Sequence, residues 1–249
     1  MRPFEITWSS KERDDAMPFR AYSKTVYRNF ATSFESQELT DDLTENSQHQ
    51  EILKQFFYTD RPALELLRPI ERVLRKSAYQ IIQEQIDSKF NPFTWYGTRY
   101  SDGTWGVLYA AESEETALKE ALYHMREFYK EEFQKKTIQV DRRVARLRVK
   151  SERAFDLLSE KDLDRAALTS QDPSGYPYCQ KLAKKLISQK AELLRAPSAR
   201  DSKGVCVPIF KKEAIQKDFG HLKFLRCIFH PDGNADVLGI KVQRWIQKR

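Results

Sequence analysis

The chain has 249 residues, of which 40% are hydrophobic, 12% aromatic and 32% charged, which is the composition of a globular protein with a sizeable core. No stretch approaches the about 18 apolar residues that a membrane-spanning helix needs, and the first residues contain no apolar segment typical of a secretory signal. We therefore expect a cytoplasmic protein that does not insert into a membrane.

The 43 lysines and arginines and the 36 aspartates and glutamates give a formal net charge of +7. This excess is compatible with a nucleic acid, an anionic substrate or an acidic protein as partner. Most basic residues alternate with acidic ones, as in KEEFQKK, so direct binding of nucleic acid is not favoured. The three cysteines and four histidines have neither CxxC nor HxxxH spacing, which predicts reduced thiols and no metal site.

The first predicted strand covers residues 18–30, which are rich in β-branched and aromatic side chains. A helical pattern follows at about residues 46–88, where Pro62 suits a helix start and Pro69 suggests a break. We interpret this block as a helical insertion after the first strand.

The middle of the chain contains a short apolar run at residues 107–111, which predicts a strand, and a helix predicted from about residue 113 to residue 133. Ser113 is a suitable N-cap, and Glu114 and Glu115 suit the positive end of the helix dipole.

The rest of the chain alternates between short strands and helices. Strands are predicted at 137–149, 153–158, 192–199, 204–210, 221–229 and 235–245, and helices at 163–167 and 178–190, with turns at 172–177 and 231–233. No linker or internal repeat divides the sequence. The pattern predicts one α+β domain over residues 1–249, in which the helical insertion occupies about residues 46–88.

Three of the eight glycines, Gly97, Gly103 and Gly106, lie just before the strand predicted at 107–111. A phosphate-binding loop instead presents its backbone N–H groups at the start of a helix, in GxxxxGK[ST] or GxGxxG spacing. Because both the spacing and the order differ here, we interpret these glycines as turn residues.

Glu120 lies at the edge of the apolar face of the predicted helix, beside the small residues Ala117 and Ala121. Periodicity alone leaves two interpretations open. Glu120 is either a solvated side chain that pairs with Lys119 or His124, or a site residue with space beside it.

The segments GTRY (97–100), GVLYAAE (106–112) and TALKE (116–120) together resemble the RES domain family of bacterial toxins. A late serine signature is matched by RAPSARDSKGVCVPIF, which places the serine at Ser198. An arginine on the first strand is matched by Arg28 in TVYRNF, with Arg20 as the alternative. The resemblance extends from about residue 18 to residue 215.

The resemblance implies a fold like that of ADP-ribosyltransferases, with packed β-sheets and flanking helices, and NAD as a substrate with no other cofactor. It implies catalytic roles for Glu120, Tyr109 and Arg28. For His124 it implies either support of the catalytic residues or packing in the core. The residues that it implies contact NAD are Arg28, Arg99, Tyr100, Tyr109 and Ser198. It also implies a helix-turn-helix antitoxin as protein partner.

The chemistry of these side chains suits such a reaction. A carboxylate such as Glu120 stabilises the cation that develops when the nicotinamide–ribose bond breaks. An aromatic ring such as Tyr109 can stack on the flat nicotinamide. Arginines such as Arg28 and Arg99 form bidentate contacts with a pyrophosphate, and Ser198 can hydrogen-bond a carboxamide or a ribose hydroxyl.

The leading hypothesis is therefore a toxin that consumes NAD by hydrolysis or phosphorolysis of its N-glycosidic bond. An alternative is an enzyme that transfers ADP-ribose to a target protein. Leu118 stands two positions before Glu120, where an arginine-directed transferase has a second acid, so the alternative is less favoured. A third hypothesis, a basic binding module without activity, has only the net charge in its favour.

Overall fold

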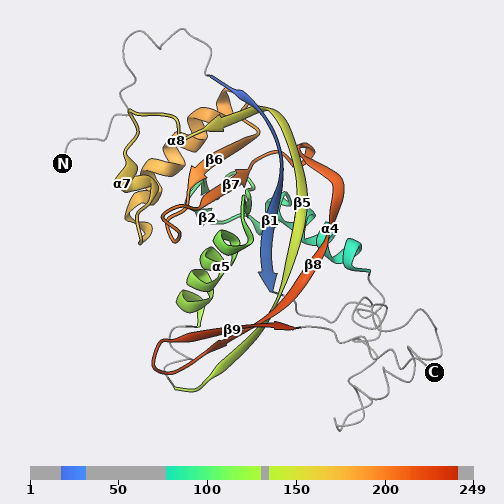
Figure 1. Cartoon of the computed structure of the whole chain (residues 1–249). Helices are drawn as coiled ribbons and strands as arrows, with labels where there is room; N and C mark the ends of the chain where they lie inside the picture. The colour runs from blue at the N-terminus through green and yellow to red at the C-terminus, as the bar shows by residue number, and fades with distance from the viewer. Residues whose placement is uncertain (1–17, 32–76, 130–134, 241–249) are drawn as a thin grey trace. The chain divides into compact units, whose positions relative to one another are not determined.

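The computed structural model describes residues 18–31, 77–129 and 135–240 (Figure 1). The helices predicted between residues 46 and 76 lie outside this part of the chain. Within it, helix α4, Ala78–Lys89, is followed by the 3₁₀ turn η2, Pro92–Thr94. No helix among the described residues combines the length and the apolar character that a membrane span requires.

The described residues group into two units by their contacts. The first unit contains residues 18–29, 85–129 and 145–219, and the second contains 30–31, 77–84, 135–144 and 220–240. All of the predicted site residues belong to the first unit. The prediction that residues 1–249 form one domain stays a prediction.

Seven strands form one mixed sheet, and they pair in the order β1-β4-β7-β6-β5-β8-β9. Their bounds are β1 Arg20–Ala31, β4 Leu108–Ala111, β5 Ile138–Asp156, β6 Leu193–Pro197, β7 Val205–Ile209, β8 Ile215–Phe229 and β9 Ala235–Ile240. The β5–β6 pair is parallel, whereas β4–β7, β6–β7 and the β8–β9 hairpin are antiparallel. The sheet and its flanking helices confirm the predicted α+β class.

Strand β1 pairs with β5 as well as with β4, so five of the strands form a closed circuit of pairings. The main sheet thus closes on itself, and the only further sheet among the described residues is the two-stranded β2–β3, Gly97–Thr98 and Ser101–Asp102. The glycines before β4 lie around this small hairpin. Gly103 adopts a positive φ of 94°, which suits glycine.

Strand β5 corrects the prediction of separate strands at 137–149 and 153–158, because it runs without interruption for 19 residues. In the sequence, Ser151 interrupts the alternation of apolar and polar residues that predicts a strand. In the structure it is buried, with only 4% of its surface exposed. Its hydroxyl donates a hydrogen bond to Glu192 Oε2 at 2.7 Å and accepts one from the backbone N–H of Arg153 at 2.9 Å. A buried hydroxyl with satisfied hydrogen bonds continues the strand as an apolar residue would.

Helix α5, Glu114–Phe128, follows β4 directly. The predicted N-cap forms, because Ser113 Oγ accepts a hydrogen bond from the backbone N–H of Thr116 at 3.1 Å. The buried face of α5 consists of Thr116, Ala117, Ala121 and Met125. The helix ends at residue 128, with Tyr129 as its C-cap, before the predicted end at about 133.

Helix α7, Arg165–Leu168, and helix α8, Tyr176–Ser188, lie side by side (Figure 1). The 3₁₀ turns are η3, Pro173–Gly175, and η4, Lys212–Ala214. Helix α8 begins two residues before its predicted start, because Pro177 occupies the first turn, where its missing N–H costs nothing. Its residues Leu182 and Leu186 are fully buried in a core shared with Phe155 and Leu194 of the sheet.

A network of charged side chains in the first unit joins three strands, β1, β5 and β6, to the residue that follows β4. Arg195 on β6 contacts Glu112 at 2.6 Å and Asp156 at 3.0 Å. Glu112 also contacts Lys24 at 2.8 Å and accepts a hydrogen bond from Tyr22 at 3.3 Å. Glu112 stands between β4 and the N-cap of α5, so the network fixes the point at which the helix begins.

The pKa of Glu112 reflects two opposed effects. Burial by itself raises this pKa, but hydrogen bonds from Arg195 and Lys24 outweigh burial and hold it below its ordinary value of 4.5. A carboxyl group with a lower pKa in the folded chain stabilises the fold above the pH at which it ionises in the unfolded chain. That contribution is lost as the pH falls through the folded pKa.

We predict that Glu112→Gln lowers the free energy of unfolding by about 2 kcal/mol near neutral pH, because Arg195 and Lys24 lose a charged partner. The difference from the wild type should shrink below about pH 4, and urea unfolding at the two pH values measures it. Asp218→Asn is the control, because its contact with Arg146 is 3.7 Å long and exposed, and its effect should stay within about 0.5 kcal/mol. A Glu112 effect that is equally small at neutral pH would contradict the assignment.

Candidate active site

The structure brings Glu120 and Ser198 into direct contact, although they are 78 residues apart in the sequence. Glu120 lies in the second turn of α5, and Ser198 follows the last residue of β6. Ser198 Oγ donates a hydrogen bond to Glu120 Oε1 at 2.5 Å. Ser198 is 4% exposed, whereas Glu120 is half-buried.

The hydroxyl of Ser198 is fixed by the turn that contains it. Its Oγ accepts hydrogen bonds from the backbone N–H groups of Arg200 at 3.1 Å and Asp201 at 3.0 Å. A hydroxyl offers one donor and two acceptor positions, so the remaining proton points to Glu120. Within the described part of the chain, Glu120 Oε2 has no hydrogen-bond partner. One carboxylate oxygen is thus held, and the other can accept a hydrogen bond from a ligand.

Asp201 forms a second connection between this turn and α5. Its carboxylate accepts hydrogen bonds from Thr116 Oγ1 at 2.7 Å and from Lys119 Nζ at 3.0 Å. Gly204 allows this close packing, because a Cβ at this position would lie 2.6 Å from the side chain of Thr116. The turn at 198–204 is therefore attached to the N-terminal half of the helix at two places.

Cys206 also contacts the carboxylate. Its Sγ lies 3.5 Å from Glu120 Oε1, and β7 places it opposite Ala111 of β4. Burial and then the charge of Glu120 raise the pKa of this thiol well above its ordinary value. The thiol therefore stays protonated and acts as a weak donor to the carboxylate. The sequence placed Cys206 only within a predicted strand, and no motif singled it out.

Arg99 is held by backbone carbonyl groups. Its guanidinium donates hydrogen bonds to the carbonyls of Ala167 at 3.2 Å, Leu168 at 3.3 Å and Ser170 at 2.7 Å. It also lies over the ring of Tyr176, with 5.0 Å from its central carbon to the ring centroid. These are contacts with neutral groups.

The charges of Arg99 and Glu120 act on the same neighbours. Burial raises the pKa of Tyr176, Glu120 adds to this increase, and Arg99 opposes it. The same opposition holds at Cys206, where burial is again the largest cause. A positive and a negative group thus flank one region of the first unit.

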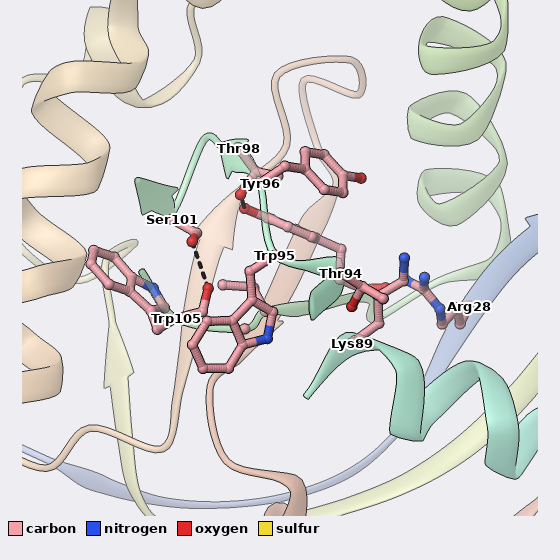
Figure 2. Close-up of a pocket in the computed structure, with 11 residues that line it drawn as sticks. Arg28, Lys89, Thr94, Trp95, Tyr96, Thr98, Ser101 and Trp105 are labelled. Atoms are coloured by element: carbon pink, nitrogen blue, oxygen red, sulfur yellow. Dashed lines mark hydrogen bonds between the residues drawn. The ribbon is translucent and has the colours of Figure 1, made fainter. Parts of the chain in front are cut away.

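A second group of predicted residues lines a pocket of about 70 Å³ (Figure 2). Arg28 and Tyr109 are both in its wall, and Arg28 Nη1 donates a hydrogen bond to the backbone carbonyl of Tyr109 at 2.5 Å. The other lining residues are Lys89, Thr94, Trp95, Tyr96, Thr98, Ser101, Trp105, Gly106 and Val107. Glu120 and Ser198 are not among them.

The pocket combines aromatic walls with two basic side chains. Burial, and then the charge of Arg28, lower the pKa of Lys89, so the two cations repel each other there. Tyr109 is fixed through its hydroxyl, which is 2.8 Å from Thr98 Oγ1 and accepts a hydrogen bond from the backbone N–H of Tyr100 at 2.9 Å. Burial raises the pKa of Tyr109, so the phenol is neutral at physiological pH.

Gly106 determines how closely the pocket wall approaches α4. A Cβ at this position would lie 2.2 Å from the carbonyl oxygen of Lys89 and 2.6 Å from Trp95 Nε1. Any larger residue would therefore displace the end of α4.

The remaining predicted residues are distributed as follows. Arg20 is exposed at the first position of β1, so of the two first-strand arginines only Arg28 reaches the pocket. Tyr100 is 1% exposed and packs in the core, which keeps its ring out of the pocket wall. His124 was expected to support the site or pack in the core, but it is exposed and its ring packs edge-on against Tyr123. Its position one turn beyond Glu120 faces solvent.

We predict that Ser198→Ala lowers the free energy of unfolding by about 1–3 kcal/mol, because two backbone N–H groups and Glu120 lose their partner. Chemical denaturation measures the change. Ser188→Ala is the matched control, since its exposed hydroxyl only donates to the carbonyl of Lys185, and its effect should stay within about 0.5 kcal/mol. Equal effects of the two substitutions would show that the hydrogen bonds of Ser198 contribute no more to stability than an exposed one does.

No curated protein matches the sequence. Among solved structures, the chain is similar to one from the crystal structure of the M. tuberculosis MbcT–MbcA toxin–antitoxin complex. The TM-score is 0.42 and the identity 12%, with 86% of this chain and 88% of that chain covered. The RES domain matches residues 69–223, which is more than half of the chain, and the protein therefore belongs to the RES domain family.

Proposed function

We propose that the protein is a toxin that consumes NAD by cleaving the bond between nicotinamide and ribose. Membership of the RES domain family supports this reaction class. The observation that carries the proposal is the hydrogen bond from Ser198 to Glu120, which fixes one carboxylate oxygen and leaves the other without a partner among the described residues. The family resemblance also supports an antitoxin of the helix-turn-helix class as partner.

In the proposed reaction the C1′–N bond breaks and nicotinamide leaves with the bonding electron pair as a neutral base. The ribose is left as an oxocarbenium ion, whose positive charge the Glu120 carboxylate stabilises. Glu120 Oε2 accepts a hydrogen bond from a ribose hydroxyl, while Ser198 prevents the carboxylate from rotating away. An acceptor, water or phosphate, then forms the new bond to C1′ and releases a proton.

The pocket supplies groups that suit the rest of NAD. Tyr109 is one of its lining residues, and the two hydrogen bonds of its hydroxyl hold the ring in place. In the proposed complex this ring stacks on nicotinamide. Arg28 provides a positive charge in the same wall. Burial raises the pKa of both Tyr109 and Cys206, and the charge of Arg99 opposes the increase at each. Tyr109 lines the pocket and Cys206 contacts Glu120, so Arg99 acts electrostatically on both places.

We predict that Glu120→Gln lowers kcat for nicotinamide release by at least about 100-fold, because an amide cannot stabilise the ribosyl cation as a carboxylate does. Nicotinamide release from NAD by purified protein, followed by chromatography, is the measurement. Glu115→Gln is the matched control, since Glu115 is an exposed residue of the same helix that pairs with Lys119. Nicotinamide release by the Glu120 variant at the wild-type rate would contradict the mechanism.

The acceptor is identified in the same reaction mixture. ADP-ribose as the product indicates water, and ADP-ribose 1″-phosphate that forms only when phosphate is added indicates phosphorolysis. Label from NAD that appears on protein would support transfer of ADP-ribose instead. No nicotinamide release at all, together with salt-sensitive retention of nucleic acid, would favour a binding module and overturn the proposal.

The two first-strand arginines allow a paired test of the pocket. We predict that Arg28→Gln raises KM for NAD by about tenfold or more through the loss of one charged contact, whereas Arg20→Gln leaves it unchanged. Steady-state kinetics of nicotinamide release gives both values. An equal KM for the two variants would show that the pocket is not part of the NAD-binding site.

A further inference from the structure

The segment Ala167–Gln171, named here the strap, is held beside the candidate site by side chains from several parts of the first unit. Arg99 binds the carbonyls of Ala167, Leu168 and Ser170, which lie at the end of α7. Tyr123 on α5 donates a hydrogen bond to the carbonyl of Gln171 at 2.9 Å. Gln171 is exposed, so the strap forms part of the surface.

Arg200 holds the strap from the side of Ser198. Its Nη1 donates to Gln171 Oε1 at 2.7 Å and reaches the carbonyl of Ser170 at 3.5 Å. Its guanidinium stacks on Tyr123, with 3.3 Å from the central carbon to the ring centroid. In return, Gln171 Nε2 donates to the carbonyl of Ala199. Two arginines thus share Ser170 as an acceptor.

Neither arginine has an anionic partner at ion-pair distance in the described part of the chain. The Nε group of Arg200 is buried and has no hydrogen-bond partner there. A guanidinium binds a phosphate through two parallel charge-assisted hydrogen bonds, which are about twice as strong as bonds to a neutral carbonyl. A phosphate would therefore replace the strap carbonyls and also satisfy Nε.

The two arginines lie near the carboxylate that the proposed reaction uses. Burial raises the pKa of Tyr176, Arg99 and then Arg200 oppose this increase, and Glu120 adds to it. Arg200 is also only two residues beyond Ser198, whose hydroxyl accepts its backbone N–H. An anion held by Arg99 and Arg200 would be adjacent to the ribose that Glu120 contacts.

We propose that Arg99 and Arg200 together bind the diphosphate of a dinucleotide, and that the strap occupies these arginines in the free protein and is released when the diphosphate binds. The choice of NAD as the dinucleotide rests on the proposed function, whereas the anion site and its strap do not. Binding thus has two stages: the arginines exchange carbonyl oxygens for phosphate oxygens, and the end of α7 loses the side chain that capped it.

The strap itself supplies the first readout, which needs no catalysis. Hydrogen exchange of residues 167–171 is measured by mass spectrometry on the full chain, alone and with inorganic pyrophosphate, ADP-ribose or nicotinamide riboside. Pyrophosphate and ADP-ribose should raise the exchange rate of the strap, because released carbonyls loosen α7. Nicotinamide riboside, which has no diphosphate, should leave the rate unchanged. No response to pyrophosphate or ADP-ribose would overturn the proposal.

Arg200→Gln and its control identify the side chain responsible. Arg200→Gln should abolish the response to pyrophosphate and raise KM for NAD by about tenfold. Arg153→Gln is the matched control, because Arg153 also donates to backbone carbonyls, those of Gln189 and Lys190, and stacks on the ring of Phe19. A variant of Arg200 that responds as the wild type does would overturn the assignment.

Tyr123→Phe tests the strap without removing a ligand group. The substitution keeps the aromatic ring on which Arg200 stacks, but it removes the hydrogen bond from the Tyr123 hydroxyl to the carbonyl of Gln171. Exchange of the strap should rise in the absence of any anion, and KM for NAD should fall by about fivefold, the equivalent of one hydrogen bond. An unchanged strap and an unchanged KM would show that the strap does not compete with the substrate.

The two proposals fail separately. A strap that pyrophosphate releases through Arg200, in a protein that liberates no nicotinamide from NAD, would retain the anion site and overturn the proposed reaction. Nicotinamide release that depends on Glu120 but not on Arg200, with a strap that no diphosphate moves, would retain the reaction and overturn the anion site.

Discussion

The hydroxyl of Ser198 is the group on which the candidate site depends. It donates its single proton to Glu120 and accepts hydrogen bonds from the backbone N–H groups of Arg200 and Asp201. The same hydroxyl therefore fixes both the shape of the β6–β7 turn and the orientation of the carboxylate. Asp201 secures the same turn to Thr116 and Lys119. Because helix and turn are attached twice, the carboxylate cannot shift unless the end of the sheet shifts with it.

The sheet holds the other end of this assembly. Glu112 stands directly before the N-cap of α5 and joins Arg195, Lys24 and Tyr22. The helix that carries Glu120 is thus fixed at its start by ion pairs and one turn later by the Ser198 turn. Such a rigid frame is what a carboxylate needs in order to stabilise a short-lived cation, since a donor or acceptor that must first reorient loses much of its effect.

Local features of the fold could be predicted from the sequence, and contacts between distant segments could not. The N-cap at Ser113 and the strand before it follow from neighbouring residues, and both form. The break predicted after residue 149 was wrong, because the partner that buries Ser151 is Glu192, 41 residues away. Periodicity left Glu120 between two interpretations, and only folding brings Ser198 to it. The carbonyl partners of Arg99 and the role of Arg200 depend on where the chain passes after α7, which no motif encodes.

Cys206 gives the site a chemical property of its own. Only the thiolate form of cysteine reacts readily with oxidants and alkylating agents, and here burial and the adjacent carboxylate keep the thiol protonated by raising its pKa well above the ordinary value. A sulfur atom 3.5 Å from Glu120 can therefore serve as a hydrogen-bond donor without making the site sensitive to oxidation. Burial first, and then the charge of Glu120, keep this cysteine in its unreactive thiol form. We therefore expect the site to survive oxidising conditions that inactivate enzymes with reactive thiols.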